Sequence, residues 1–136
     1  MKVKQLKIIC ASMFLALGLS ACSKPDVTGV WIPEKVSPDD IFYEYYEIKK
    51  MEGTDRYQFI TNLFSIKAGF KGDEVPYRIG EPKTMVLDFT KDNTYCVEGS
   101  MNTKCVVAVD GGKLDIYERG RFVKSSSNPP TIPVNK

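Results

Sequence analysis

Short strand-like runs that end in turn-forming residues dominate the sequence from residue 29 onward, and this pattern restricts the fold more than any other feature. Within the runs, β-branched and aromatic residues alternate with polar ones, and glycine, asparagine or aspartate separates the runs. Runs that recur at intervals of about 8–12 residues are typical of antiparallel sandwiches and barrels. We therefore expect an all-β domain: a small antiparallel β-barrel or sandwich built of hairpins, with at most one short helix and one disulfide.

The sequence YEIKKMEGTDRYQFIT predicts a hairpin that turns at residues 52–55. Its register follows from pairing Met51 with Arg56. Apolar and aromatic side chains then share the buried face: Tyr46, Ile48, Tyr57 and Phe59. Polar side chains share the opposite, solvent-exposed face: Glu47, Lys49, Arg56 and Gln58. This alternation is typical of a sheet with one buried side and one exposed side.

Similar patterns predict the remaining strands. GVWI at residues 29–32 predicts a first strand, and MVLDFTKDNTYCV predicts a hairpin that turns at residues 91–93. CVVAVDGGKLDIY predicts a hairpin that turns at residues 110–113, and GRFVK predicts a last strand. We expect the β domain to span residues 28–124. The polar, proline-rich residues 125–136 are expected to form an extended or disordered tail.

Residues 37–53 fit two structures. Ser37 suits a helix N-cap, Pro38 suits the first helical position, and the apolar residues at 41, 42, 45, 46 and 48 fit one helical face. The aromatic content and the hairpin register favour a strand instead. We expect one helical turn from Pro38 followed by a strand, with a helix over the whole segment as the alternative.

The first 21 residues have the order of a secretory signal peptide. Three lysines precede the apolar run Ile8 to Leu19, and the small residues Ser20 and Ala21 follow it. The run is shorter than the roughly 20 apolar residues that a transmembrane helix needs. We expect residues 1–21 to be removed on export.

Leu19-Ser20-Ala21-Cys22 resembles the lipobox of bacterial lipoproteins. The resemblance implies cleavage before Cys22, a diacylglycerol on its thiol and an acylated, often palmitoylated, amino group; two or more chains anchor a protein stably. An ordinary cleavage site before a cysteine is the alternative. Because Ser23 rather than aspartate follows the cysteine, the resemblance implies the outer membrane, facing the periplasm or the cell exterior. Residues 22–27 would be a short lipidated linker.

The other cysteines fit an exported protein. Cys10 lies in the signal peptide and Cys22 is the predicted lipid attachment site, which leaves Cys96 and Cys105. An oxidising compartment favours a disulfide between these two. A metal site is the competing interpretation, but the chain contains no histidine and no further cysteine to complete one.

The orientation of this pair conflicts with the simplest sheet. If Cys105 faces the interior with Val107 and Val109, simple pairing turns Tyr95 and Val97 outward. A β-bulge, or a sheet covered on both faces, would resolve the conflict.

The charge of the mature chain argues against nucleic acid as a partner. The whole chain has 19 basic and 17 acidic residues, and removal of three lysines with the signal peptide leaves 16 against 17. No basic cluster of the kind that contacts phosphates is present in the sequence.

Gly29-Val30-Trp31 is similar to the Gly-x-Trp at the first strand of lipocalins and lipocalin-like bacterial domains. The resemblance implies a small barrel that Trp31 closes at one end, with a later arginine, Arg119 or Arg121, packed on the indole. The alternative is that Trp31 is an ordinary core residue.

The residues also bear on the class of function. Without histidine there is no Ser–His or Cys–His nucleophile, and the acidic pairs Asp39-Asp40, Glu44/Glu47 and Asp73-Glu74 fit solvated turns or strand faces. We expect no enzyme activity, catalytic residue, cofactor or metal. We expect a membrane-anchored lipoprotein that binds a protein partner in the envelope, as an accessory subunit or as an inhibitor or immunity protein against a periplasmic enzyme. The alternative is a lipocalin-like binder of a small apolar ligand.

The exposed face of the first hairpin is the predicted partner surface. Tyr43 and Tyr45 are the candidate anchors, since buried aromatic residues usually carry affinity. Polar residues beside them would tune association rate and specificity: Glu47, Lys49, Arg56 and Gln58.

Overall fold

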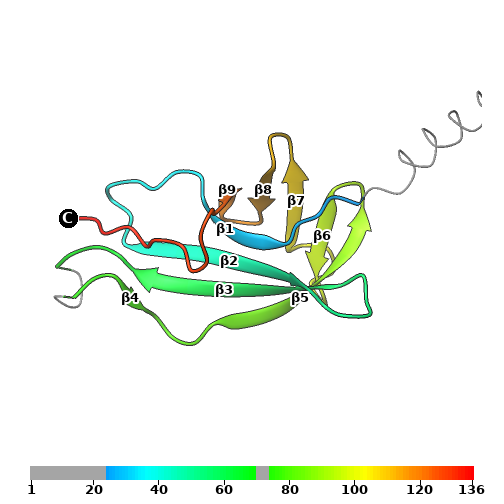
Figure 1. Cartoon of the computed structure of the whole chain (residues 1–136), viewed down its shortest axis with the longest axis horizontal. Coiled ribbons are helices and arrows are strands. Elements are labelled where there is room, and N and C mark those ends of the chain that lie inside the picture. The colour runs from blue at the N-terminus through cyan, green and yellow to red at the C-terminus, as the bar shows by residue number, and fades with distance from the viewer. Residues whose placement is uncertain (1–23, 70–73) are drawn as a thin grey trace, which may run out of the picture.

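The computed structural model describes residues 24–69 and 74–136, which form nine β-strands and no helix (Figure 1). The predicted signal peptide and Cys22 lie outside the described residues. The strands are β1 (Gly29–Pro33), β2 (Phe42–Lys50), β3 (Tyr57–Ser65), β4 (Tyr77–Arg78), β5 (Lys83–Lys91), β6 (Thr94–Val97), β7 (Cys105–Val109), β8 (Lys113–Ile116) and β9 (Gly120–Lys124). No helix among the described residues is long and apolar enough to cross a bilayer.

Eight of these strands form a closed antiparallel barrel. The order is β2-β1-β9-β8-β7-β6-β5-β3, and β3 pairs again with β2 to close the ring. β4 adds to β3 as one extra strand. Figure 1 shows the long strands β2 and β3 side by side, with the short strands β6, β7 and β8 crossing them. The all-β prediction is confirmed, and the architecture is a barrel rather than a sandwich.

The first hairpin has the predicted register. Ile48 pairs with Phe59, and the backbone N–H of Met51 donates to the carbonyl of Arg56 at 2.9 Å. The helical alternative for residues 37–53 is wrong. Only a single turn forms, closed by the N–H of Asp40 and the carbonyl of residue 37 at 3.1 Å, and β2 follows it. The strand is favoured because both of its edges pair, one with β1 and one with β3.

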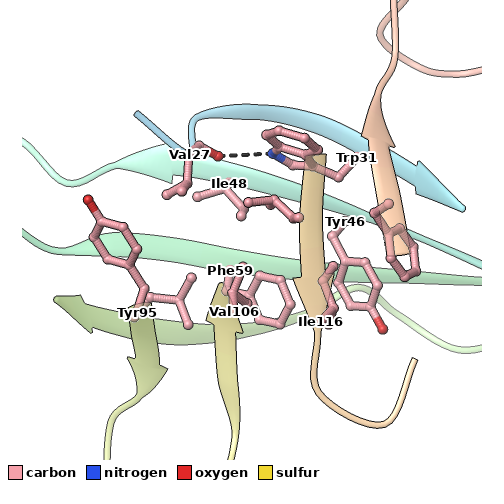
Figure 2. Packing of buried hydrophobic residues seen from close by; sticks show 11 residues of the cluster. Val27, Trp31, Tyr46, Ile48, Phe59, Tyr95, Val106 and Ile116 are labelled. Carbon is pink, nitrogen blue, oxygen red and sulfur yellow. Dashed lines mark hydrogen bonds between the residues drawn. The ribbon is translucent and has the colours of Figure 1, made fainter. Parts of the chain in front are cut away.

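Side chains fill the barrel interior (Figure 2). The row runs from Tyr95 at one end to Tyr46 at the other, and Tyr46 stacks on Phe59 with 4.7 Å between ring centroids. Eleven buried residues make up this cluster: Val27, Trp31, Tyr46, Ile48, Phe59, Leu87, Tyr95, Val106, Leu114, Ile116 and Phe122. Small barrels of eight strands are commonly filled in this way.

Trp31 lies inside the barrel, where its Nε1 donates to the carbonyl of Val27 at 2.9 Å. The basic side chain over its ring is Lys124, with Nζ 5.5 Å from the ring centroid. The expectation of an arginine here is wrong, because Arg119 and Arg121 form ion pairs with carboxylates elsewhere on the barrel. Lys124 reaches the indole because β9 pairs with β1 in a register that places it opposite Trp31.

Cys96 and Cys105 form the predicted disulfide. They lie opposite each other on β6 and β7, with their Cα atoms 4.0 Å apart. The assumption that Cys105 faces the interior is wrong: Tyr95 and Val106 are fully buried in the barrel core, and the alternation turns both cysteines outward. No bulge is needed at this pair, since the irregularity in β5–β6 pairing falls between residues 89 and 91.

The tail after β9 is extended and packs on the outside of the barrel. The N–H of Ser125 donates to the carbonyl of Val30, and the N–H of Asn135 donates to that of Ile66, both at 2.8 Å. The Asn135 side chain also donates to the carbonyl of Asp40 at 2.8 Å. These contacts hold both ends of the tail against the chain.

Candidate functional site

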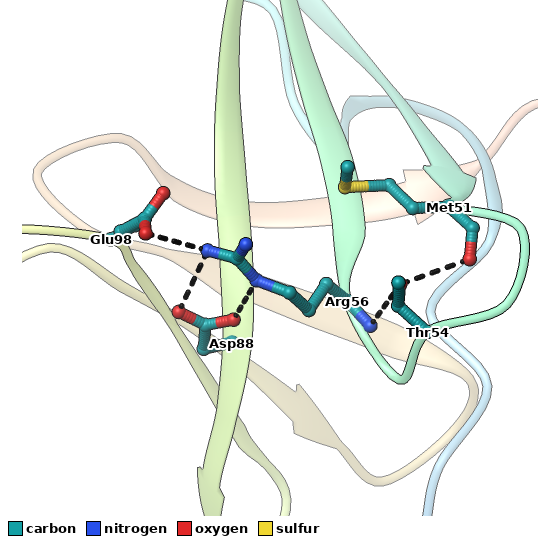
Figure 3. Close-up of polar contacts among 5 residues, drawn as sticks. All are labelled: Met51, Thr54, Arg56, Asp88 and Glu98. Carbon is teal, nitrogen blue, oxygen red and sulfur yellow. Dashed lines mark hydrogen bonds and ion pairs between the residues drawn. The ribbon is translucent and has the colours of Figure 1, made fainter.

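The hairpin register turns the four predicted polar residues outward, and Arg56 is the most strongly engaged of them (Figure 3). Its Nε lies 2.6 Å from a carboxylate oxygen of Asp88, and its Nη2 lies 2.8 Å from one of Glu98. Hydrogen bonds to these two carboxylates raise the pKa of Arg56. A partner would therefore have to compete for this guanidinium, and a binding role for Glu47, Lys49, Arg56 and Gln58 stays a prediction.

The two predicted anchors, Tyr43 and Tyr45, lie on the outer face of β2 but are only 5% exposed each. They belong to a second apolar cluster, which Ile132 of the tail helps to cover. Tyr45 stacks on Phe64 with 5.9 Å between ring centroids. Burial raises the pKa of the Tyr43 hydroxyl. Both rings are thus packed against the protein itself, and neither is open to a partner in this structure.

A concave surface, which we call the cup, lies at one end of the barrel and has a volume of about 360 Å³. β2 and β3 form one wall, and the segment between β4 and β5 and the β8–β9 turn form the others. The residues that line the cup are Glu44, Tyr46, Thr61, Leu63, Ile79, Gly80, Glu81, Lys83, Tyr117 and Arg119.

An ion pair lies in the wall of this cup. The Nε of Arg119 is 3.2 Å from Oε2 of Glu44, and the Tyr46 hydroxyl donates to the same oxygen at 2.5 Å. The Glu44 side chain is 19% exposed and that of Arg119 is 52% exposed, so the pair is reachable from solvent on the arginine side. Burial and then the contact with Glu44 raise the pKa of Tyr46, and the charge of Glu44 raises that of Arg119.

A second hollow of about 300 Å³ adjoins the cup and shares Glu44 and Arg119 with it. Its other lining residues are Pro33, Lys35, Val36, Asp40, Phe42, Tyr43, Glu118 and Phe122. Val36 and Phe42 are among the exposed large hydrophobic residues, Phe42 at 52%. We call the cup and this second hollow together the barrel mouth. The mouth therefore combines an ion pair with apolar surface on two sides.

The mouth lies far from the start of the described chain. The Nζ of Lys24 is 4.0 Å from a carboxylate oxygen of Asp55, in the β2–β3 turn, and 4.9 Å from the centroid of the Phe89 ring. Glu44 lies near the opposite end of the same two strands. The chain thus enters at the end of the barrel remote from the cup.

Among the described residues, no group of three or more histidine, cysteine or acidic side chains is arranged to hold a metal ion. What the mouth offers is hydrogen-bonding capacity from a charged pair. Comparisons with known protein families, curated proteins and solved structures give no significant match. The fold and the site are therefore interpreted from their own residues.

Sequence reasoning missed this site. The sequence pattern indicates Glu44 only as part of an acidic pair, and Arg119 only as a residue that could pack on Trp31. The alternation of Glu44, Tyr46 and Ile48 placed the glutamate on the buried face, which was a usable signal. Its partner could not be found in the same way, because Arg119 comes from a distant turn.

Proposed function

We propose that this protein is a lipid-anchored envelope protein that binds a segment of a protein partner at its barrel mouth. The observation that carries the proposal is the filled interior: aromatic and aliphatic side chains occupy the barrel, and charged side chains line the cup at its end. A carrier of apolar molecules needs an enclosed apolar cavity. A charged cup at the end of a filled barrel suits a partner that binds from outside.

The anchor supports the same proposal. The lipobox resemblance at Leu19–Cys22 implies attachment through Cys22, and Lys24 follows only two residues later. Since Lys24 packs at the end opposite the cup, an anchored chain would turn its mouth away from the bilayer. We propose an outer-membrane location, facing the periplasm or the cell exterior. An accessory subunit and an inhibitor or immunity protein both need a presented binding face of this kind.

A lipocalin-like small-molecule binder is the second candidate. The closed eight-stranded barrel and the packing of Trp31 favour it. The cup is near the lower end of the range of about 300–1,000 Å³ for small-molecule sites. Its charged wall fits a polar ligand better than an apolar one.

The test is affinity capture from detergent-solubilised envelopes with the full chain, comparing Arg119→Gln with the matched control Arg121→Gln. Arg121 also forms an ion pair, with Asp115 at 2.6 Å, but on the outer surface. We expect a stoichiometric protein that binds the wild type and the control but is lost with Arg119→Gln. Capture that survives Arg119→Gln would place the interface elsewhere. A stoichiometric small molecule without a protein would favour the lipocalin-like alternative.

A further inference from the structure

The ion pair at the mouth has unused hydrogen-bonding capacity of both kinds. Both close contacts of the Glu44 carboxylate use Oε2, which leaves Oε1 without a partner among the described residues. Arg119 contacts this carboxylate through Nε and also donates to the Tyr46 hydroxyl. A guanidinium has five N–H donors, so these two contacts leave donors of Arg119 beside Oε1 of Glu44.

The charges of the cup balance. Two acidic and two basic side chains line it: Glu44, Glu81, Lys83 and Arg119. A ligand group with a formal charge would lose hydration on entering the cup and meet no surplus of the opposite charge there, which disfavours its binding. The second hollow differs, because three acidic side chains and two basic ones line it. A neutral group that both donates and accepts hydrogen bonds does not meet this penalty, and an amide is such a group.

The shape of the mouth favours an extended ligand. The cup and the second hollow meet at the Glu44–Arg119 pair, so a chain that crosses the pair has a hollow on either side. Successive side chains of an extended peptide point to opposite sides and advance by about 3.3 Å per residue. Tyr117 offers an aromatic wall on the cup side, and Phe42 offers one in the second hollow.

The turn that carries the arginine has an unusual backbone conformation. Glu118, between Tyr117 and Arg119, has a φ of 60°. This left-handed conformation is uncommon for residues other than glycine, asparagine and aspartate. Non-glycine residues in two other turns share this conformation: Asp92, Met101 and Asn102. In the β8–β9 turn, both neighbours of Glu118, Tyr117 and Arg119, line the cup.

We infer that the barrel mouth recognises an extended, uncharged peptide segment, with the backbone N–H and carbonyl of one residue bound by Glu44 and Arg119. In an extended chain these two groups of one residue point to the same edge. The N–H donates to Glu44 Oε1, and the carbonyl accepts from a terminal nitrogen of Arg119. The neighbouring side chains of the segment occupy the two hollows. This inference rests on the proposed function and specifies what the protein partner contributes to the interface.

The test uses a library of fluorescent hexapeptides that are acetylated at one end, amidated at the other and free of charged residues. Fluorescence polarisation with the full chain in detergent micelles measures binding. We expect selected peptides to bind, and an aspartate or lysine at their central position to weaken binding at least tenfold. Glu44→Gln and Arg119→Lys should each weaken it at least tenfold, since the first removes an acceptor and the second the paired donors.

Asp115→Asn and Arg121→Gln, which alter an outer ion pair of the same chemistry, are the matched controls and should leave affinity unchanged. Native fluorescence of Trp31 shows that each variant is folded. The inference is overturned if no uncharged peptide binds, if charged peptides bind better, or if the Glu44 and Arg119 variants bind normally. If one of these outcomes is found but a captured protein partner still depends on Arg119, the peptide inference fails and the proposed function stands. If the captured partner does not depend on Arg119, the peptide inference and the proposed function both fail.

Discussion

Replacement of Gly29 by alanine should destabilise the barrel where β1 and β9 close it. Gly29 has a φ of +132°, a value that side-chain-bearing residues rarely adopt and that lies outside the left-handed helical region. A Cβ at this position would lie 2.6 Å from Cε of Lys124. The substitution therefore strains the backbone and displaces the lysine that lies over Trp31.

The two effects differ in size. Backbone strain of this type is worth about 1–3 kcal/mol. Lys124 can move aside because the contact is with the end of a flexible side chain, so its part is the loss of a cation–π contact worth about 0.5–1 kcal/mol at an exposed site. Together they amount to about 1.5–4 kcal/mol, a large share of the roughly 5–15 kcal/mol of a typical domain. The Tm should fall by about 5 °C or more.

Urea unfolding followed by fluorescence measures this change, because Trp31 is the single tryptophan of the chain and is buried. Gly53→Ala is the matched control: Gly53 also has a positive φ, of 71°, but no atom lies within 4 Å of a Cβ built there. The φ of Gly53 is close to the left-handed helical region, so we expect Gly53→Ala to lower the free energy of unfolding by less, about 1 kcal/mol. The same loss from Gly29→Ala as from Gly53→Ala would refute the reasoning. In a Lys124→Ala background the Gly29→Ala loss should be smaller by about 0.5–1 kcal/mol, because the cation–π contact is already absent and only the backbone strain remains.

Four further predictions concern other parts of the chain. Reduction of the Cys96–Cys105 disulfide should lower the free energy of unfolding by about 2–3 kcal/mol in the chain-entropy model; a Tm that does not change on reduction would contradict this. Burial chiefly raises the pKa of Tyr95 to about 12, so the folded state keeps a proton that the unfolded state loses near its ordinary value of 10.0. The Tyr95 contribution to stability should therefore be constant below about pH 10 and fall between about pH 10 and 12, so that the loss over this range is less steep in Tyr95→Phe, as urea titrations at several pH values would show. Ile132→Asp should release the tail and expose the tyrosine cluster, seen as faster proteolysis of the C-terminus with an unchanged barrel core; equal proteolysis rates would count against tail docking. Cys22→Ala should abolish labelled palmitate incorporation and membrane partitioning, and equal labelling of the two proteins would exclude the lipobox interpretation.

The sequence by itself determined the parts of the fold that depend on neighbouring residues. The β2–β3 register follows from a turn of a few residues, and the period of two in strand structure then decides which side chains are buried. The disulfide followed from the only two cysteines left in the expected mature domain. In both cases the information lies within a short stretch of chain, or within a count of residues.

Tertiary structure alone decided the rest. Closure of β1 on β9 made the sheet a barrel and placed Lys124, rather than an arginine, over Trp31. The same closure brought Arg119 to Glu44, although 75 residues separate them (119 − 44). Alternation turned Tyr45 outward without showing that the tail would cover it. Local periodicity defines the two faces of a strand, but what each face meets depends on strand order and stagger, which are set by pairings between distant segments.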